Sequence, residues 1–294
     1  MSIKDFVRKN TPKFLLDWNR RRKKKKRNSE LQQQKAITRE ELVRNLRDIG
    51  IVEGDIVLVH SSLSRIGFLE EGPKTLVDAL RETVGSDGHI LMPTSPNNVY
   101  QLDYIQNTPS FDVLNTPSQT GKITEYFRQL PEAVRSLHPT EPVSALGPKA
   151  KYFVKDHFGQ LTPYNENSPF YKVSKEGGKI LYIGVTLSMA GTNLHTLEDA
   201  VDFKFPIYYP EIFDFKVIDE QGQSHIIQTK VHDPAWSKKR KCDELIPMFQ
   251  EQGALKRVKI GQADTLLVDA KKFLDVMIDQ YQKKGVTMYT PKGS

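Results

Sequence analysis

The segment GDIVLVHSSLSRIG (residues 54–67) decides the fold. Its centre, Ile56 to Val59, is an unbroken apolar run that is too short for a helix. A Gly54-Asp55 turn precedes the run, and a loop that begins at Ser61 follows it. This combination is typical of a strand that is buried on both faces of a sheet. Such strands occur in sheets that helices cover on both sides.

The segments before and after this strand are predicted to be helices and further strands. Thr38 followed by Glu41 is a capping box, which predicts the start of a helix. This helix carries Leu42, Leu46 and Ile49. The apolar spacing predicts further helices over residues 74–84, 121–129, 150–158, 193–201, 242–252 and 270–284. It also predicts strands over 89–93, 179–185 and 264–268, and a hairpin over 213–218 and 224–230. Irregular loops are expected over 94–120 and 135–139. The pattern predicts an α/β fold.

Composition places the chain among globular proteins. Of 294 residues, 38% are hydrophobic and 27% charged, which suits a folded chain with a core. A single cysteine, Cys242, excludes an internal disulfide framework and a cysteine-rich zinc cluster. No run approaches the roughly 20 apolar residues that span a bilayer, and no secretory signal is evident. We expect a cytoplasmic protein.

The net charge of +7 is unevenly distributed. Residues 1–30 hold 12 of the 43 basic and 3 of the 36 acidic residues, a net of +9. The remaining chain therefore holds 31 basic and 33 acidic residues, a net of −2. This division predicts a basic, partly amphipathic N-terminal arm (residues 1–36) attached to a nearly neutral domain (residues 37–294).

The arm contains eight consecutive basic residues, Arg20 to Arg27, preceded by scattered apolar side chains. Each basic residue near an anionic membrane surface contributes about 1 kcal/mol, so one interpretation is peripheral binding to the inner face of the membrane. The other is a helix docked on the domain and followed by a solvated linker. Nucleic acid is not expected as a partner, because no aromatic residues interleave with the charges.

Three histidines lie near predicted strand ends, where α/β sheets collect ligands: His60, His138 and His195. His195 and Glu198 are three residues apart at the start of a predicted helix and share one face. A carboxylate on one ring nitrogen raises the basicity of the imidazole, which can then act as a general base. By spacing alone, the pair is more often a surface or capping pair.

The serines that follow His60 offer hydroxyl and backbone N–H donors at the end of a strand. Ser61, Ser62 and Ser64 can cradle a phosphate or an oxyanion, although a serine-rich turn is an equal alternative. The segment lacks the elbow motif of nucleophilic serines. No metal site is expected, since the histidines are widely separated. His232 and Asp233 are read as a loop pair, with an acceptor contact as the alternative.

An ordered set of motifs resembles the aminoglycoside 3-N-acetyltransferase family, which has the antibiotic N-acetyltransferase fold. The motifs are VHSSLSRIG (59–67), GxxTLVDAL (72–80), VGxxGxILMPT (84–94), TPSxTG (116–121), RSxHP (135–139), ILYIGV (180–185), TxLHxxE (192–198) and IGxA (260–263). Each motif is weak alone, but their succession across residues 38–284 is specific.

The resemblance implies a three-layer α/β/α fold with a central mixed sheet and an N-acetyltransferase that uses acetyl-CoA without a metal. The implied catalytic residues are His195, Glu198 and His60. The resemblance implies that the coenzyme contacts come from two motifs: Ser61, Ser62 and Ser64 of the first, and Arg135, Ser136 and His138 of the RSxHP block. Direct transfer to the acceptor amine, without an acetyl-enzyme, is expected.

The charge balance bears on the acceptor. Aminoglycosides are polycations, and a nearly neutral domain with a basic arm is poorly suited to attract them. The main interpretation is therefore N-acetylation of a nucleotide- or lipid-linked amino sugar in surface polysaccharide synthesis. The first alternative is an aminoglycoside 3-N-acetyltransferase that confers antibiotic resistance. The second is a non-catalytic protein that docks membrane or nucleic acid through its arm.

Overall fold

The computed structural model describes residue 22 and residues 35–294. The predicted membrane or linker role of the basic arm falls on residues outside this part of the chain and stays a prediction. Among the described residues, none of the helices has the length and apolar character needed to cross a membrane.

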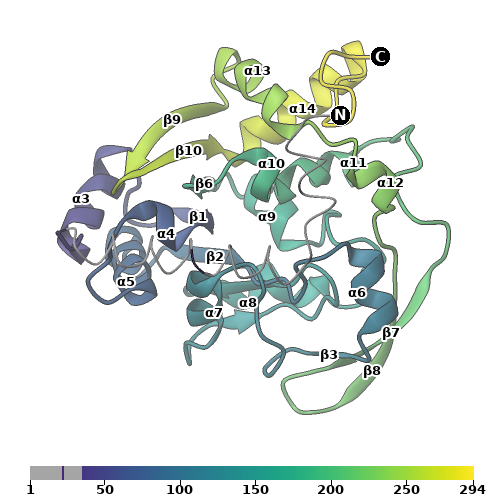
Figure 1. Cartoon of the computed structure of the whole chain (residues 1–294), viewed down its shortest axis with the longest axis horizontal. Coiled ribbons are helices and arrows are strands. Elements are labelled where there is room, and N and C mark those ends of the chain that lie inside the picture. The colour runs from purple at the N-terminus through teal and green to yellow at the C-terminus, as the bar shows by residue number, and fades with distance from the viewer. Residues whose placement is uncertain (1–21, 23–34) are drawn as a thin grey trace.

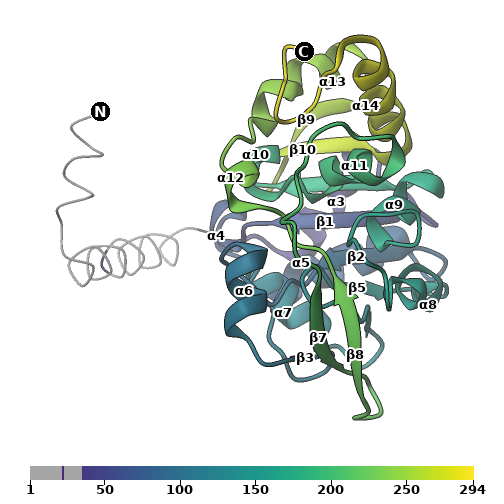
Figure 2. The same cartoon turned by 90° about the vertical axis from the view of Figure 1, so that its right-hand side faces the viewer.

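A seven-stranded mixed sheet forms the centre of the fold, in the order β4-β5-β2-β1-β6-β10-β9. The middle strand β1 (Ile56–Ser61) pairs in parallel with β2 (His89–Pro93) and β6 (Lys179–Ile183). The flanking strands join antiparallel: β5 (Val143–Leu146), β4 (Val134–Arg135), β10 (Ala263–Asp269) and β9 (Leu255–Ile260). Figure 2 shows the strands above one another, from β9 and β10 at the top to β5 below.

Alternate side chains of β1 enter two different cores, as a strand buried on both faces requires. Val57 and Val59 pack in one core with α3 (Arg39–Asp48), α5 (Pro73–Val84) and α7 (Lys122–Arg128). Leu58 packs in the other core, whose helices are α8 (Ala150–Val154), α9 (Pro169–Lys175), α13 (Ile246–Glu251) and α14 (Ala270–Lys284). Helices thus cover both faces of the mixed sheet, which confirms the predicted fold class (Figure 1).

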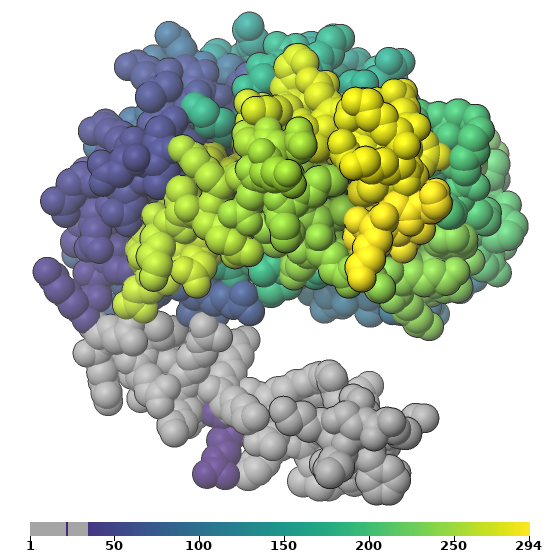
Figure 3. Space-filling view, turned by 90° about the horizontal axis from the view of Figure 1, so that it is seen from above, coloured from purple at the N-terminus to yellow at the C-terminus, as the bar shows by residue number. Residues whose placement is uncertain are grey.

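The capping box at Thr38 is confirmed. The side chain of Thr38 accepts a hydrogen bond from the Glu41 N–H at 3.3 Å, and α3 begins at the next residue. Helix α14 ends at Lys284, and Gly285, with its positive φ, provides a left-handed cap. In Figure 3 this C-terminal part lies beside α13 and the β9–β10 pair on one face of the molecule.

A second, three-stranded sheet lies beside the large one. It contains β3 (Phe111–Asp112), β7 (Phe213–Ile218) and β8 (Ser224–Thr229). The β7–β8 hairpin confirms the predicted hairpin and projects from the body in Figure 2. The predicted loop over 94–120 is wrong in part, because it contains α6 (Gln101–Asn107) and β3. Strand β3 pairs with β7, about a hundred residues later, so local sequence carried no signal for it.

The sequence also missed β4, β5 and β9, which lie toward the two edges of the large sheet. β9 (LKRVKI) mixes apolar side chains with exposed lysine and arginine and lacks the continuous apolar run of the central strands. The remaining short helices are α4 (Leu63–Ile66), α10 (Leu187–Ala190), α11 (Thr196–Ala200), α12 (Pro234–Ser237) and the 3-10 turns η1 (Lys155–His157), η2 (Thr192–His195) and η3 (Cys242–Leu245).

Candidate active site

The carboxyl ends of β1 and β6 bring two predicted site residues to one edge of the sheet. In the parallel register His60 pairs with Tyr182, and the two rings stack with centroids 4.8 Å apart. The chain that leaves β6 continues through α10 into η2, which ends at His195. The Thr192 hydroxyl of η2 lies 3.3 Å from His60 Nε2. Residues more than 130 positions apart therefore meet at one edge.

Glu198 is the centre of a buried hydrogen-bonded cluster. Its Oε2 lies 2.9 Å from His195 Nδ1 and 2.8 Å from His232 Nε2, and its Oε1 accepts a hydrogen bond from the Tyr289 hydroxyl at 2.7 Å. The side chain of Glu198 has no exposed surface. Tyr164 stacks on His195 at 4.8 Å between ring centroids. The carboxylate therefore fixes the orientation of both imidazoles.

Burial sets the protonation states of this cluster. Burial lowers the pKa of His195 to about 3, although the Glu198 carboxylate opposes the shift. Burial alone would raise the pKa of Glu198, but His195 and His232 hold it well below its ordinary value. The expectation that Glu198 raises the pKa of His195 is therefore wrong in net direction, because loss of water outweighs the single carboxylate. Near neutral pH, a neutral imidazole donates through Nδ1 to an ionised carboxylate, and Nε2 is left as the basic nitrogen.

A cleft of about 720 Å³ runs along the end of β1. Its lining includes His60, Ser61, Ser62 and Ser64, so the first predicted coenzyme motif lies along one wall. Ser61 Oγ is buried there and has no hydrogen-bond partner. Burial lowers the pKa of His60 to about 4, so its ring is neutral at neutral pH. We call this space the first cleft.

A smaller cleft of about 310 Å³ adjoins the first. His195 and His232 form part of its lining. The two clefts share the lining residues Asn97, Glu141, Met189, Ala190 and Thr192. They therefore meet between His60 on one side and His195 on the other. We call the smaller space the second cleft.

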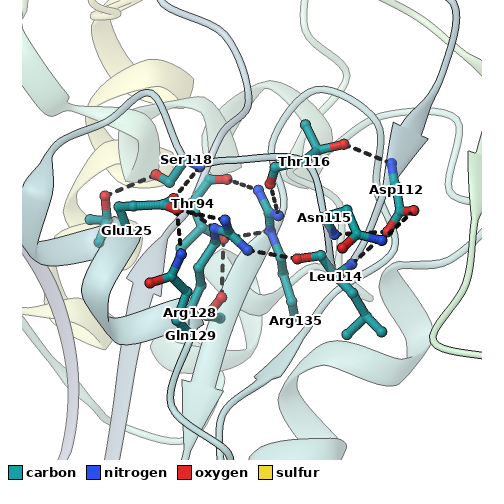
Figure 4. Close-up of polar contacts among 12 residues, drawn as sticks. Thr94, Asp112, Leu114, Asn115, Thr116, Ser118, Glu125, Arg128, Gln129 and Arg135 are labelled. Atoms are coloured by element: carbon teal, nitrogen blue, oxygen red, sulfur yellow. Dashed lines mark hydrogen bonds and ion pairs between the residues drawn. The ribbon is translucent and has the colours of Figure 1, made fainter.

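Arg135 does not line either cleft within the described part of the chain. Figure 4 shows its guanidinium inside a loop that starts after β2. Nε donates to the Thr94 hydroxyl at 3.1 Å, Nη1 donates to the Thr116 carbonyl at 2.6 Å, and Nη2 donates to the Thr94 carbonyl. Burial lowers the pKa of Arg135 to about 9. These contacts tie the loop over 94–116 to the sheet.

Ser136 and His138 are also absent from the described linings of the two clefts. Both are buried, and His138 stacks on His157 with centroids 4.5 Å apart. The Ser136 hydroxyl lies 2.9 Å from His157 Nδ1 and accepts a hydrogen bond from the Val143 N–H at 2.9 Å. The RSxHP block thus supports the β4–β5 turn from inside.

The Glu198 cluster also has the spacing of a three-ligand metal site, since the ligand atoms of His195, Glu198 and His232 lie within 4.8 Å of one another. Both nitrogens, however, converge on one carboxylate oxygen at hydrogen-bond length. A metal ion would have to replace these two bonds. The expected absence of a metal stays a prediction.

Sequence reasoning missed several residues of the site. His232 was read as a loop residue, yet it contacts Glu198 directly. Tyr289 and Glu141 received no role, although Glu141 is buried between the clefts and accepts hydrogen bonds from Ser95 at 2.6 Å and Gln101 at 2.9 Å. Arg240 lines the second cleft. Their sequence separation from the LHxxE motif left no local signal.

Comparison with known proteins supports the similarity of sequence and fold. Aminoglycoside N(3)-acetyltransferase VII of Streptomyces paromomycinus is 27% identical over 84% of this chain and 92% of that protein. Aminoglycoside N(3)-acetyltransferase VIII of Streptomyces fradiae is 33% identical over 55% of this chain, and the aligned part spans 60% of that relative.

The alignments with two solved structures span almost the whole of those chains. AAC-IIIb in a binary complex with CoASH has a TM-score of 0.72 and 27% identity, over 85% of this chain and 97% of the other. AAC-VIa bound to sisomicin has a TM-score of 0.72 and 28% identity, over 84% and 98%. Residues 58–282 match the family model described as aminoglycoside 3-N-acetyltransferase. This chain belongs to the aminoglycoside 3-N-acetyltransferase family.

Proposed function

We propose that the protein is an N-acetyltransferase that transfers an acetyl group from acetyl-CoA to a primary amine of an aminoglycoside-type amino sugar. The observation that carries the proposal is the meeting of two clefts beside a neutral His195 whose Nδ1 is held by Glu198. The CoASH complex of AAC-IIIb supports the coenzyme, and the sisomicin complex of AAC-VIa supports the acceptor class.

The residues of the first cleft fit an acetyl-CoA molecule, which would supply the acetyl group as a thioester. Ser61 Oγ is an orphaned buried donor at the inner wall, suited to the oxygen of a tetrahedral intermediate. Ser62 and Ser64 line the same wall and would hold the chain of the coenzyme. For Arg135, Ser136 and His138 we propose support of the 94–116 loop and the β4–β5 turn in place of direct coenzyme contact.

His195 moves the proton in this proposal. A primary amine attacks only in its neutral form and must lose a proton as the C–N bond forms. His195 Nε2 accepts that proton, and Glu198 stabilises the resulting imidazolium through Nδ1. The C–S bond breaks in the same transfer, and a thiolate leaves without a protein nucleophile. His60, neutral on the other side of the junction, orients the groups in the first cleft.

The release of free thiol from acetyl-CoA tests this function. Sisomicin, other aminoglycosides and free amino sugars are offered one at a time, with acetyl-CoA alone as the control. Acceptor-dependent thiol release supports the proposal. Its absence across the panel favours the alternative of a non-catalytic protein. A labelled acetyl group that stays on the protein without acceptor would contradict direct transfer.

A nucleotide- or lipid-linked amino sugar is a second candidate acceptor, as in surface polysaccharide synthesis. The charge of the second cleft favours it: among the described residues that line this cleft, Glu141 is the one carboxylate and Arg240 the one guanidinium. A polycation has little to pair with there. A panel with UDP-linked and dTDP-linked amino sugars separates the two acceptor classes.

Residues 1–30, with a net charge of +9, are proposed to bind an anionic membrane surface. Co-sedimentation of the full chain and of a chain lacking residues 1–30 with vesicles of phosphatidylglycerol and phosphatidylcholine tests this. Loss of binding on deletion supports the surface role, and equal binding contradicts it.

A further inference from the structure

Arg240 is a half-buried cation at the second cleft, and two of its donor atoms are unsatisfied. Its Nε and Nη2 are buried and have no hydrogen-bond partner. Burial would lower the pKa of Arg240, but the neighbouring Tyr289 and Glu198 raise it, so the guanidinium stays charged. A buried donor without an acceptor is destabilising, and more so when the group is charged. A group that accepts these hydrogen bonds is therefore missing from the protein itself.

The chain on either side of Arg240 is basic. Lys238, Lys239, Arg240 and Lys241 are four consecutive cations that follow α12. Lys238 Nζ lies 5.8 Å from the ring centroid of Tyr100, which lines the second cleft. The three lysines are exposed, so the rim of this cleft attracts anions.

Glu141 provides the opposite charge inside the cleft. It is buried at the junction with the first cleft, where Ser95 and Gln101 donate to its two oxygens. A carboxylate at the junction suits the amine end of an acceptor, because an ammonium group pairs with it before deprotonation. The second cleft thus holds one negative and one positive group.

We infer that the acceptor carries an anionic group, a phosphate or a carboxylate, which Arg240 binds in the second cleft while the amine faces His195. The inference rests on the proposed function for the identity of the second cleft as the acceptor cleft, and it selects the second candidate acceptor, a nucleotide- or lipid-linked amino sugar, over an aminoglycoside, which carries no such anion. A bidentate guanidinium is well suited to either anion, and the lysines at the rim would steer it toward the cleft.

An electrostatic effect of Arg240 on Glu198 and His195 has to be distinguished from the binding of an anion. Its positive charge acts on Glu198 and also lowers the pKa of His195. If that were its function, Arg240 would be a positioning residue, and its loss would change kcat and the pH profile with every acceptor. Binding of an acceptor anion instead affects KM, and only for acceptors that bear the anion.

Matched acceptors test the inference: glucosamine, glucosamine 6-phosphate and glucosamine 1-phosphate, with acetyl-CoA held at saturation. We expect a KM about 10- to 100-fold lower for a phosphorylated acceptor than for glucosamine. Arg240→Gln should remove this difference by raising the KM of the phosphorylated acceptors toward that of glucosamine, and Arg240→Lys should restore part of it. Lys256→Gln, an exposed change of equal charge on β9, is the control.

An equal loss with all three acceptors, or a raised KM for acetyl-CoA alone, would overturn the inference. A second measurement needs no turnover. Sodium phosphate and sodium glucuronate are titrated into the protein saturated with CoA, so that the first cleft is filled, and binding is followed by calorimetry. Binding that weakens at least 10-fold in Arg240→Gln supports the anion site even if no acceptor is acetylated, and the tighter probe identifies the anion. Equal binding by both proteins would exclude it.

Discussion

Two buried histidine clusters lie in the same domain and differ in two respects. His195 and His232 converge on Glu198 and line a cleft, whereas His138 and His157 stack on each other and contact a hydroxyl and backbone groups. Both clusters are almost fully buried, and both lie in or near a motif that the family resemblance marks as functional. A buried carboxylate and an open cleft, more than burial or motif membership, distinguish a site for chemistry from a structural cluster.

The largest expected effect comes from removing the charge that distinguishes the first cluster. Glu198→Gln should lower kcat about 10²- to 10⁴-fold, because the imidazolium of His195 loses its counter-charge. The free energy of unfolding should also fall, by about 1–3 kcal/mol, because His195, His232 and Tyr289 lose the charged oxygens that they contact. Thiol-release kinetics and thermal unfolding measure the two effects, with Glu220→Gln in the exposed β7–β8 turn as the control. If Glu198→Gln kept the wild-type kcat, a buried carboxylate would not distinguish a catalytic cluster from a structural one.

A change in the second cluster should lower the stability of the protein and leave kcat nearly unchanged. In His157→Phe the Ser136 hydroxyl and the Pro163 carbonyl lose partners at 2.9 and 3.0 Å. We expect the free energy of unfolding to fall by about 1–3 kcal/mol, while kcat of the folded enzyme stays within about twofold. Urea unfolding and kinetics on the same preparation check this. A selective loss of kcat at unchanged stability would assign the second cluster to catalysis.

A smaller effect is expected at His232, which contacts the same oxygen of Glu198 as His195 does. His232→Gln should lower kcat about 10-fold by loosening the carboxylate that orients His195. A positioning role also predicts a changed pH profile of kcat/KM, which a purely structural residue would not alter. Equal pH profiles for wild type and variant would leave His232 without a role in orienting the base.

The smallest expected effect is a change in how steeply the free energy of unfolding depends on pH. Burial lowers the folded-state pKa of His157 to about 3, below the value of about 6.5 in the unfolded chain. Between these values the unfolded state binds more protons, so this contribution to stability is complete above about pH 6.5. It is lost as the pH falls toward 3, at up to about 1.4 kcal/mol per pH unit. Unfolding of wild type and His157→Phe at pH 7.5, 6 and 5 should give a shallower slope for the variant, and identical slopes would contradict the account.

The central strands and the His195–Glu198 pair were predictable because both signals are local. Strand β1 is a continuous apolar run, and the pair lies within one helical turn. The carboxyl ends of parallel strands then placed His60 at the same edge of the sheet. The family resemblance, which rests on the order of these motifs along the chain, then assigned them to one known fold.

The rest of the site depends on contacts between distant residues. His232 and Tyr289 reach Glu198 from 34 and 91 residues away. Arg135 belongs to the RSxHP motif, for which the family resemblance implied a coenzyme contact, but its guanidinium donates to the hydroxyl of Thr94 and to carbonyls of the loop over residues 94–116. The pKa of His195 depends on burial, which spacing alone does not reveal. Tertiary contacts therefore decided which motif residues line a cleft.

The most direct test of the account is the rate of acetyl transfer by His195→Ala, with acetyl-CoA and an accepted amine both at saturation. We predict a loss of kcat of about 10²-fold or more in the folded enzyme, with CoA binding close to wild type. His138→Ala, measured in parallel, should lose stability but not kcat in the folded fraction. Turnover by His195→Ala at the wild-type rate would contradict the assignment of His195 as the base.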